Sequence, residues 1–176
     1  RRSSDLSTSL TYAASPASTT TIAATGGNGD GAISIAVSQS SSTVCSLSNG
    51  IVTALSAGTC VVEATKAGST NYLSASDSIS ITIAKANQTP LVAASTHNAI
   101  TITGGNTTTT LSYTGGSGTG AATWTLDSSS VGICSLVGTT VTAVASGSCV
   151  VNLTKAASVN YLVATEIGRA SCRERV

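Results

Sequence analysis

The chain has 176 residues, of which 9% are charged, and its eight Lys and Arg against seven Asp and Glu give a formal net charge of +1. So small an excess of positive charge does not suit a nucleic-acid or acidic-lipid partner, and we expect neither. No apolar run approaches the roughly 20 residues of a membrane-spanning helix, so we also expect no membrane insertion.

Apolar and polar residues alternate with a period of two along most of the chain, which predicts β-strands separated by turns of Gly, Asn and Ser. In the first half we expect strands near 8–14, 19–24, 31–38, 43–48, 50–55, 59–66 and 78–85. In the second half we expect them near 91–94, 99–103, 108–114, 121–127, 132–137, 139–144, 148–155 and 161–165. Glycine-rich turns are predicted at 26–31 and 115–120, and a tight hairpin at Asn49-Gly50.

One stretch of the chain, residues 45–72, returns as residues 134–161, so that every matched residue is displaced by 89 positions. Between 43–76 and 132–165, 18 of 34 positions are identical and no gap is needed. A fixed period of this kind indicates a tandem array of one structural unit.

Two modules follow from this period: module 1 over residues 7–87 and module 2 over residues 88–165. They meet at a short polar joint, where Pro90 stops the preceding strand from continuing. Seven or eight short strands in fewer than a hundred residues predict an immunoglobulin-like β-sandwich for each. A β-solenoid is the alternative all-β fold, but its repeats run roughly 20–50 residues, which counts against it.

The two ends differ from the rest of the sequence. RRSSDL (1–6) and EIGRASCRERV (166–176) resemble in-frame translations of sequencing adapters; a native basic tail is the alternative. These ends hold five Arg and three acidic residues, so removing their net +2 changes the formal charge from +1 to −1 and leaves four cysteines. We therefore expect the natural protein to span about residues 7–165.

Because the chain is then a fragment, each module is expected to lack one natural edge strand. Adding 89 to the strand at 78–85 leads into the C-terminal tail, and subtracting 89 from the strand at 91–94 leads into the N-terminal end. We expect these ends to be frayed or artefactually paired, with open sheet edges that invite association.

Two cysteines recur in each module, Cys45 and Cys60 in module 1 and Cys134 and Cys149 in module 2. The alternation turns all four toward the interior, while Glu63 faces outward. We predict one disulfide per module, which would contribute on the order of 3 kcal/mol by closing a loop of about 16 residues. Zinc is disfavoured because each module offers only two thiols, and free buried thiols remain the other alternative. Disulfides place a protein outside the cytosol.

No other group of residues predicts catalysis, a cofactor or a metal. His97 lies in a polar loop without a nucleophile elbow, and the acidic residues do not repeat in position. Trp124 replaces Ile35 of module 1, so we expect it to anchor the core; an exposed platform that contacts a sugar is the alternative.

The run GTCVVEATKAGSTNYLSAS (58–76) and the following SISITIAKANQTP (78–90) resemble the tandem bacterial immunoglobulin-like (Big-type) repeats of large surface and secreted proteins. GSCVVNLTKAASVNYLVAT (147–165) matches the same pattern. The resemblance implies a non-catalytic adhesion stalk or spacer at the cell surface or outside the cell, whose partners are neighbouring repeats. A carbohydrate- or matrix-binding module, with a glycan or host protein as partner, is the alternative function.

Overall fold

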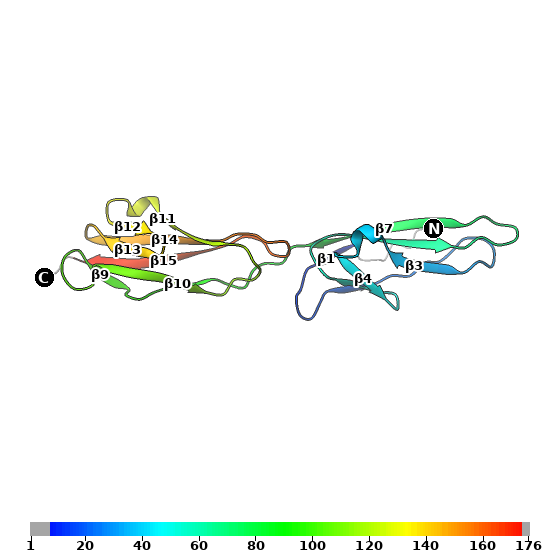
Figure 1. The fold of residues 1–176 in the computed structure, drawn as a ribbon, viewed down its shortest axis with the longest axis horizontal. Coiled ribbons are helices and arrows are strands. Elements are labelled where there is room, and N and C mark those ends of the chain that lie inside the picture. Colours follow the sequence, from blue (N-terminus) through cyan, green and yellow to red (C-terminus); the bar gives the residue numbers. More distant parts are fainter. Residues whose placement is uncertain (1–7, 174–176) are drawn as a thin grey trace. The chain divides into compact units, whose positions relative to one another are not determined.

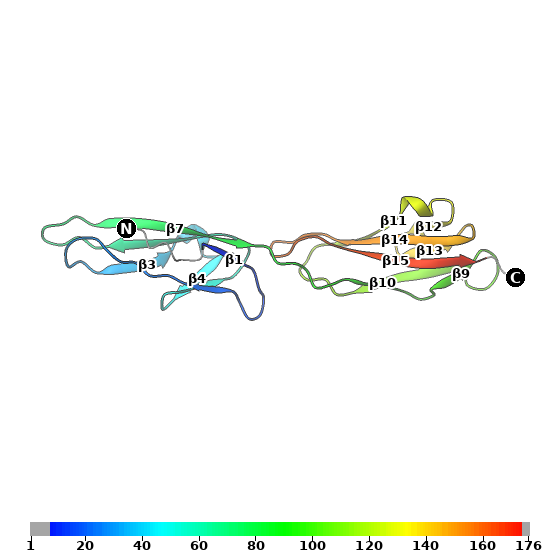
Figure 2. The same ribbon diagram turned by 180° about the vertical axis from the view of Figure 1, so that it is seen from behind.

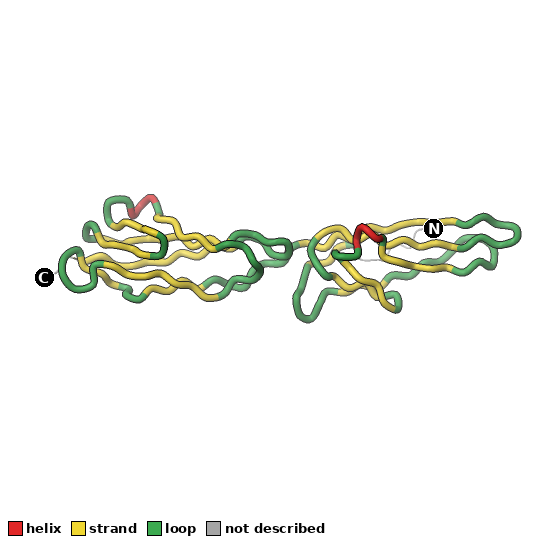
Figure 3. The backbone as a smooth tube through the Cα atoms, in the orientation of Figure 1, coloured by secondary structure: helices red, strands yellow, loops and turns green. Residues whose placement is uncertain are grey.

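In a computed structural model of the chain, which describes residues 8–173, the regular secondary structure is almost entirely β-strand, and loops connect the strands (Figures 1 and 3). Its contacts form two compact units, Arg1–Ala86 and Asn87–Val176, and we keep the names module 1 and module 2 for these units. Each module is two packed sheets with a single turn of 3-10 helix, so the fold is all-β and of the immunoglobulin-like sandwich class.

Module 1 contains a four-stranded sheet in the order β1-β7-β6-β3 and a three-stranded sheet in the order β2-β5-β4. Its strands are β1 (Ser9–Thr11), β2 (Thr19–Thr21), β3 (Ile33–Val37), β4 (Cys45–Ser48), β5 (Ile51–Ala54), β6 (Gly58–Lys66) and β7 (Ala75–Ala84). The hairpin between β4 and β5 turns at Asn49 and Gly50, which have φ of 50° and 74°. Positive φ at both central residues is what a type I′ turn requires, so the predicted hairpin is confirmed.

Module 2 contains two four-stranded sheets, in the orders β12-β13-β10-β8 and β11-β14-β15-β9. Its strands are β8 (Val92–Ser95), β9 (Ala99–Thr101), β10 (Thr108–Thr114), β11 (Ala122–Leu126), β12 (Cys134–Val137), β13 (Thr140–Ala143), β14 (Gly147–Lys155) and β15 (Ala164–Arg173). In Figures 1 and 2, β14 and β15 run side by side over their whole length, as their antiparallel register requires.

The two copies of the repeated sequence also pair their strands in the same register. β6 pairs with β7 from Gly58↔Ile83 to Lys66↔Ala75, and β14 pairs with β15 at the residues 89 positions later. The displacement changes only near the start of each module. There, Leu10 of β1 and Ile100 of β9 occupy matching positions 90 residues apart, because the connection from β1 to β2 is one residue longer than that from β9 to β10.

The predicted strands agree with the observed ones to within a few residues, except at the end of module 2. We expected a strand at 161–165 and, beyond it, an end that is either frayed or artefactually paired; β15 extends from Ala164 to Arg173, so this end is paired. It is paired on both sides, to β14 and β9, so it is an interior strand of its sheet. The expectation for the N-terminal residues 1–6 lies outside the described residues.

The alternation in the C-terminal tail explains why it forms a strand. Gly168, Ala170 and Cys172 face inward, and Ala170 and Cys172 are buried in the core of module 2, whereas Arg169 and Arg173 are exposed. From Gly168 to Arg173, small or apolar residues on one face and polar or charged residues on the other are sufficient for a half-buried strand. Of the two predicted alternatives, a frayed end and an artefactually paired one, the structure shows a paired end.

Candidate functional site

The structure joins the four repeated cysteines into two disulfides, Cys45–Cys60 and Cys134–Cys149. Their Cα atoms are 5.8 and 5.9 Å apart, and all four side chains are buried. In each module the bond joins a strand of one sheet to a strand of the other, β4 to β6 and β12 to β14. Each disulfide therefore connects the two layers of its sandwich.

A buried serine stands next to each disulfide, a feature that the sequence interpretation missed. The Ser41 hydroxyl accepts a hydrogen bond from the Val61 N–H at 3.0 Å, and the Ser130 hydroxyl accepts one from the Val150 N–H at 2.7 Å. These serines are 2% and 0% exposed and end the single 3-10 turn of each module. The signal was present, since a serine lies four residues before the first cysteine in both copies.

One lysine in each module, Lys66 in module 1 and Lys155 in module 2, lies across a glycine-rich turn. The Lys66 Nζ donates to the Gly31 carbonyl at 3.0 Å, and the Lys155 Nζ donates to the Gly120 carbonyl at 3.2 Å. A Cβ atom on Gly116 would lie 2.4 Å from Cδ of Lys155, so the lysine stem needs a glycine beneath it. Aliphatic stems of lysine often cover apolar surface in this way, so these two lysines have a structural role within their own modules.

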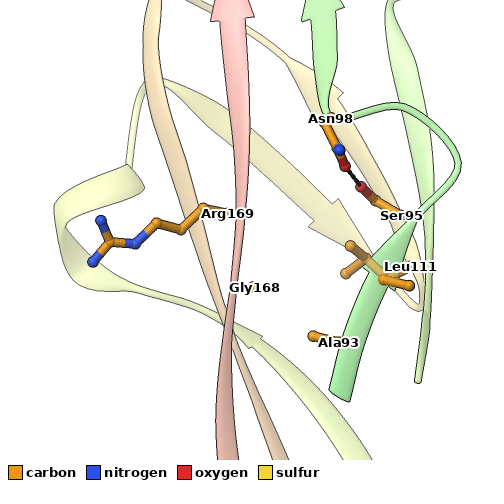
Figure 4. Close-up of a pocket in the computed structure, with 7 residues that line it drawn as sticks. Ala93, Ser95, Asn98, Leu111, Gly168 and Arg169 are labelled. Carbon is orange, nitrogen blue, oxygen red and sulfur yellow. Dashed lines mark hydrogen bonds between the residues drawn. The ribbon is translucent and has the colours of Figure 1, made fainter. Parts of the chain in front are cut away.

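Trp124, the residue expected to contact a ligand or anchor the core, is half-buried on β11 and packs against the core of module 2. Close by, a cavity of about 60 Å³ is lined by Ala93, Ala94, Ser95, Asn98, Leu111, Gly168 and Arg169. Figure 4 shows the Arg169 side chain pointing away from Ala93 and Leu111. The cavity has room for ordered water but is well below the roughly 300–1,000 Å³ typical of small-molecule sites.

The remaining polar residues of interest bond locally. His97 is exposed in the β8–β9 turn, and its backbone N–H donates to the Thr109 hydroxyl at 2.9 Å. Asp127 accepts hydrogen bonds from the Ser129 hydroxyl at 2.6 Å, the Ser129 N–H at 3.0 Å and the Asn152 amide at 3.2 Å. These bonds, the Ser129 hydroxyl foremost, lower the pKa of Asp127, because they stabilise its charged form.

Residues 8–173 contain no group of three or more His, Cys, Asp or Glu side chains placed to hold a metal ion. Within the same range, no helix is long and apolar enough to cross a membrane.

Comparison of the sequence with protein families and with characterised proteins finds no match. Among solved structures, the chain is similar to domains 1–6 of the surface layer protein SbsC, with a TM-score of 0.33 and 16% identity over 82% of this chain and 20% of that one. It is also similar to protocadherin gammaB7 repeats EC3–6, in a cis-dimer structure, with a TM-score of 0.33 and 14% identity over 80% of this chain and 40% of that one. Both are too distant to carry an argument about function.

Proposed function

We propose that the chain is a non-catalytic structural segment of a bacterial cell-surface or secreted protein, where it acts as a stalk or spacer that carries tension. Its partners are then the neighbouring repeats of the same protein. The observation that carries the proposal is the strand pairing near the two ends of each module. β1 pairs in parallel with β7, and β9 pairs in parallel with β15.

Parallel pairing matters because of the direction of pull. When the ends of such a module are drawn apart, the two strands are forced to slide along each other, so the hydrogen bonds between them are loaded together. In module 1 these include Thr82 N–H to the Thr8 carbonyl and Tyr12 N–H to the Ala84 carbonyl, both at 2.8 Å. Simultaneous rupture of several bonds needs more force than opening them one at a time.

The disulfides support the same proposal in two ways. Each one limits how far its module can extend after it unfolds, because the loop that it closes stays shut. Persistent disulfides also belong to oxidising compartments, which favours a place outside the cytosol.

The alternative function, a carbohydrate- or matrix-binding module, gains no support from Trp124. A sugar platform needs an exposed ring face, whereas this indole is half-buried and packs against the core. Glycan and matrix arrays decide between the two: specific binding that a Trp124→Ala variant loses would favour the alternative and count against a passive spacer.

Stretching single molecules of the full chain tests the proposal. We expect two discrete unfolding events, one per module. A reducing buffer should lengthen each event by roughly 50 Å, because the 15-residue separation between paired cysteines becomes free to extend at about 3.6 Å per residue. Gradual extension without discrete events would contradict a role in carrying tension.

A further inference from the structure

The two modules differ at one sheet edge. In module 2, β10 pairs with β8 from Leu111↔Ser95 to Thr114↔Val92. The residues 89 positions earlier, 22–25, form no strand, and no residue of the described range 8–173 pairs with them on that side. Module 1 therefore has a three-stranded sheet where module 2 has a four-stranded one. We call residues 22–25 the open edge.

Backbone groups of the open edge are oriented to receive a strand. The Ile22 N–H donates to the Gly50 carbonyl at 2.7 Å, as the Leu111 N–H donates to the Thr139 carbonyl at 2.8 Å in module 2. Since these groups alternate in direction along an extended strand, the N–H and C=O of Ala23 and Thr25 point to the other side. Unpaired groups in a row are a template for an added strand.

Side chains next to the open edge are less covered than their copies. Leu111 is 7% exposed, whereas Ile22 at the matching position is half-buried. Thr109 is 1% exposed and is covered by the β8–β9 turn, whereas Thr20 is half-buried. The surface that β8 and its turn cover in module 2 is thus open in module 1.

Glycines at the edge show which residues would fill it. A Cβ atom on Gly115 would lie 2.0 Å from the Pro90 carbonyl oxygen, so only glycine allows this strand to approach so closely. Gly26, the copy of Gly115, has no heavy atom within 4 Å of the same position. Likewise, Gly116 meets Leu91, which is 5% exposed, whereas its copy in module 1 meets only a lysine stem.

Near the start of each module the displacement is 90 residues, as Leu10 and Ile100 show, so the positions that match 91–96 are residues 1–6, whose structure lies outside the described range. Their sequence fits poorly, because Arg1 stands where Leu91 is buried, and an unpaired charge is costly to bury. We propose that the open edge accepts an extended strand from a further repeat, antiparallel to residues 22–25 and with the sequence pattern Pro-Leu-Val-Ala-Ala-Ser-Thr of residues 90–96. Affinity comes from main-chain hydrogen bonds, and specificity from the leucine that fills the vacant core position. The proposal does not depend on the stalk function.

A fluorescent peptide with the sequence of residues 88–97, titrated into the full chain and followed by anisotropy, tests the proposal. We expect saturable binding that Ala23→Pro weakens at least about tenfold, because proline removes the N–H that faces the added strand and blocks its approach. The Ile22 N–H, which module 1 uses internally, is unchanged. A peptide with aspartate at the position of Leu91 should not bind.

Two further controls locate the bound strand. N-methylation of the peptide at the position of Ala94 should abolish binding, whereas methylation at Ala93 should be tolerated. In module 2 the Thr96 N–H donates to the Thr110 carbonyl, so by alternation the N–H of Ala94 also faces β10 and that of Ala93 faces away. Exchanging residues 1–6 of the chain for the sequence of residues 91–96 should close the edge and abolish peptide binding. If the Ala23→Pro variant bound the peptide as tightly as the parent chain does, the peptide would be exchanging into module 2 instead of binding the open edge. Either that result or an absence of saturable binding would overturn the proposal.

Discussion

A Cβ atom built on Gly168 would lie 3.6 Å from Cζ3 of Trp124, so the largest inward residue of module 2 adjoins an inward glycine. Module 1 has Ile35 and Ile79 at the matching positions, and both pack against its core. The two modules therefore fill the same part of the sandwich with different pairs of residues. Module 1 uses two side chains of medium size, and module 2 combines a large side chain with a glycine.

Exchanging this pair should reveal the coupling between its members. We expect Trp124→Ile alone to destabilise module 2 by about 1–3 kcal/mol through the space that it leaves. Gly168→Ile alone should also destabilise module 2 by about 1–3 kcal/mol, because the new side chain meets the indole ring. The double variant should recover at least about 1 kcal/mol relative to the sum. Urea unfolding followed by circular dichroism measures all three, and strictly additive effects would contradict the interpretation.

Cysteine labelling should separate three chemical states. Alkylation of the denatured chain without a reductant should modify one cysteine, Cys172, and alkylation after reduction should modify all five. In the folded chain the Cys172 thiol should react slowly, because it is buried and burial raises its pKa, leaving little thiolate near neutral pH. Mass spectrometry counts the labels, and more than one label without reductant would show that a disulfide is open.

The strands and the inward-facing cysteines could be predicted because both depend on local alternation and on the 89-residue period. The C-terminal half of β15 was predicted only as one of two alternatives, a frayed or an artefactually paired end, because the unusual composition of the tail was given more weight than its alternating pattern. Ser41 and Ser130 illustrate a second limit. Serine is common in this chain, so a buried serine that accepts a backbone N–H cannot be distinguished by type, and only three-dimensional packing selects it.

Removing the buried hydroxyl next to a disulfide should cost stability. Ser130→Ala leaves the Val150 N–H without its acceptor, and we expect a loss of about 1–3 kcal/mol from module 2. Ser135 is a matched control, because it is exposed on β12 of the same module and its replacement by alanine should change stability by less than about 0.5 kcal/mol. Thermal unfolding measures both variants, and equal midpoints would refute the role of Ser130.

Asp127 should give module 2 a dependence on acidic pH that module 1 lacks, since the matching residue there is Ser38. The hydrogen bonds from Ser129 and Asn152 lower the pKa of Asp127 in the folded chain. A carboxyl group whose folded pKa is below its unfolded value adds stability at neutral pH, and this contribution is lost as the pH falls through the folded pKa.

The variants Ser129→Ala and Asn152→Ala should raise the Asp127 midpoint toward the ordinary range for aspartate, the first more than the second, because the Ser129 hydroxyl is the larger cause. Titration of the side-chain carboxyl carbon by NMR measures each midpoint directly. Asp127→Asn provides the control for stability, because its unfolding midpoint should lose the acid-dependent component that Asp127 gives the parent chain. An Asp127 midpoint that neither variant moves would contradict this assignment.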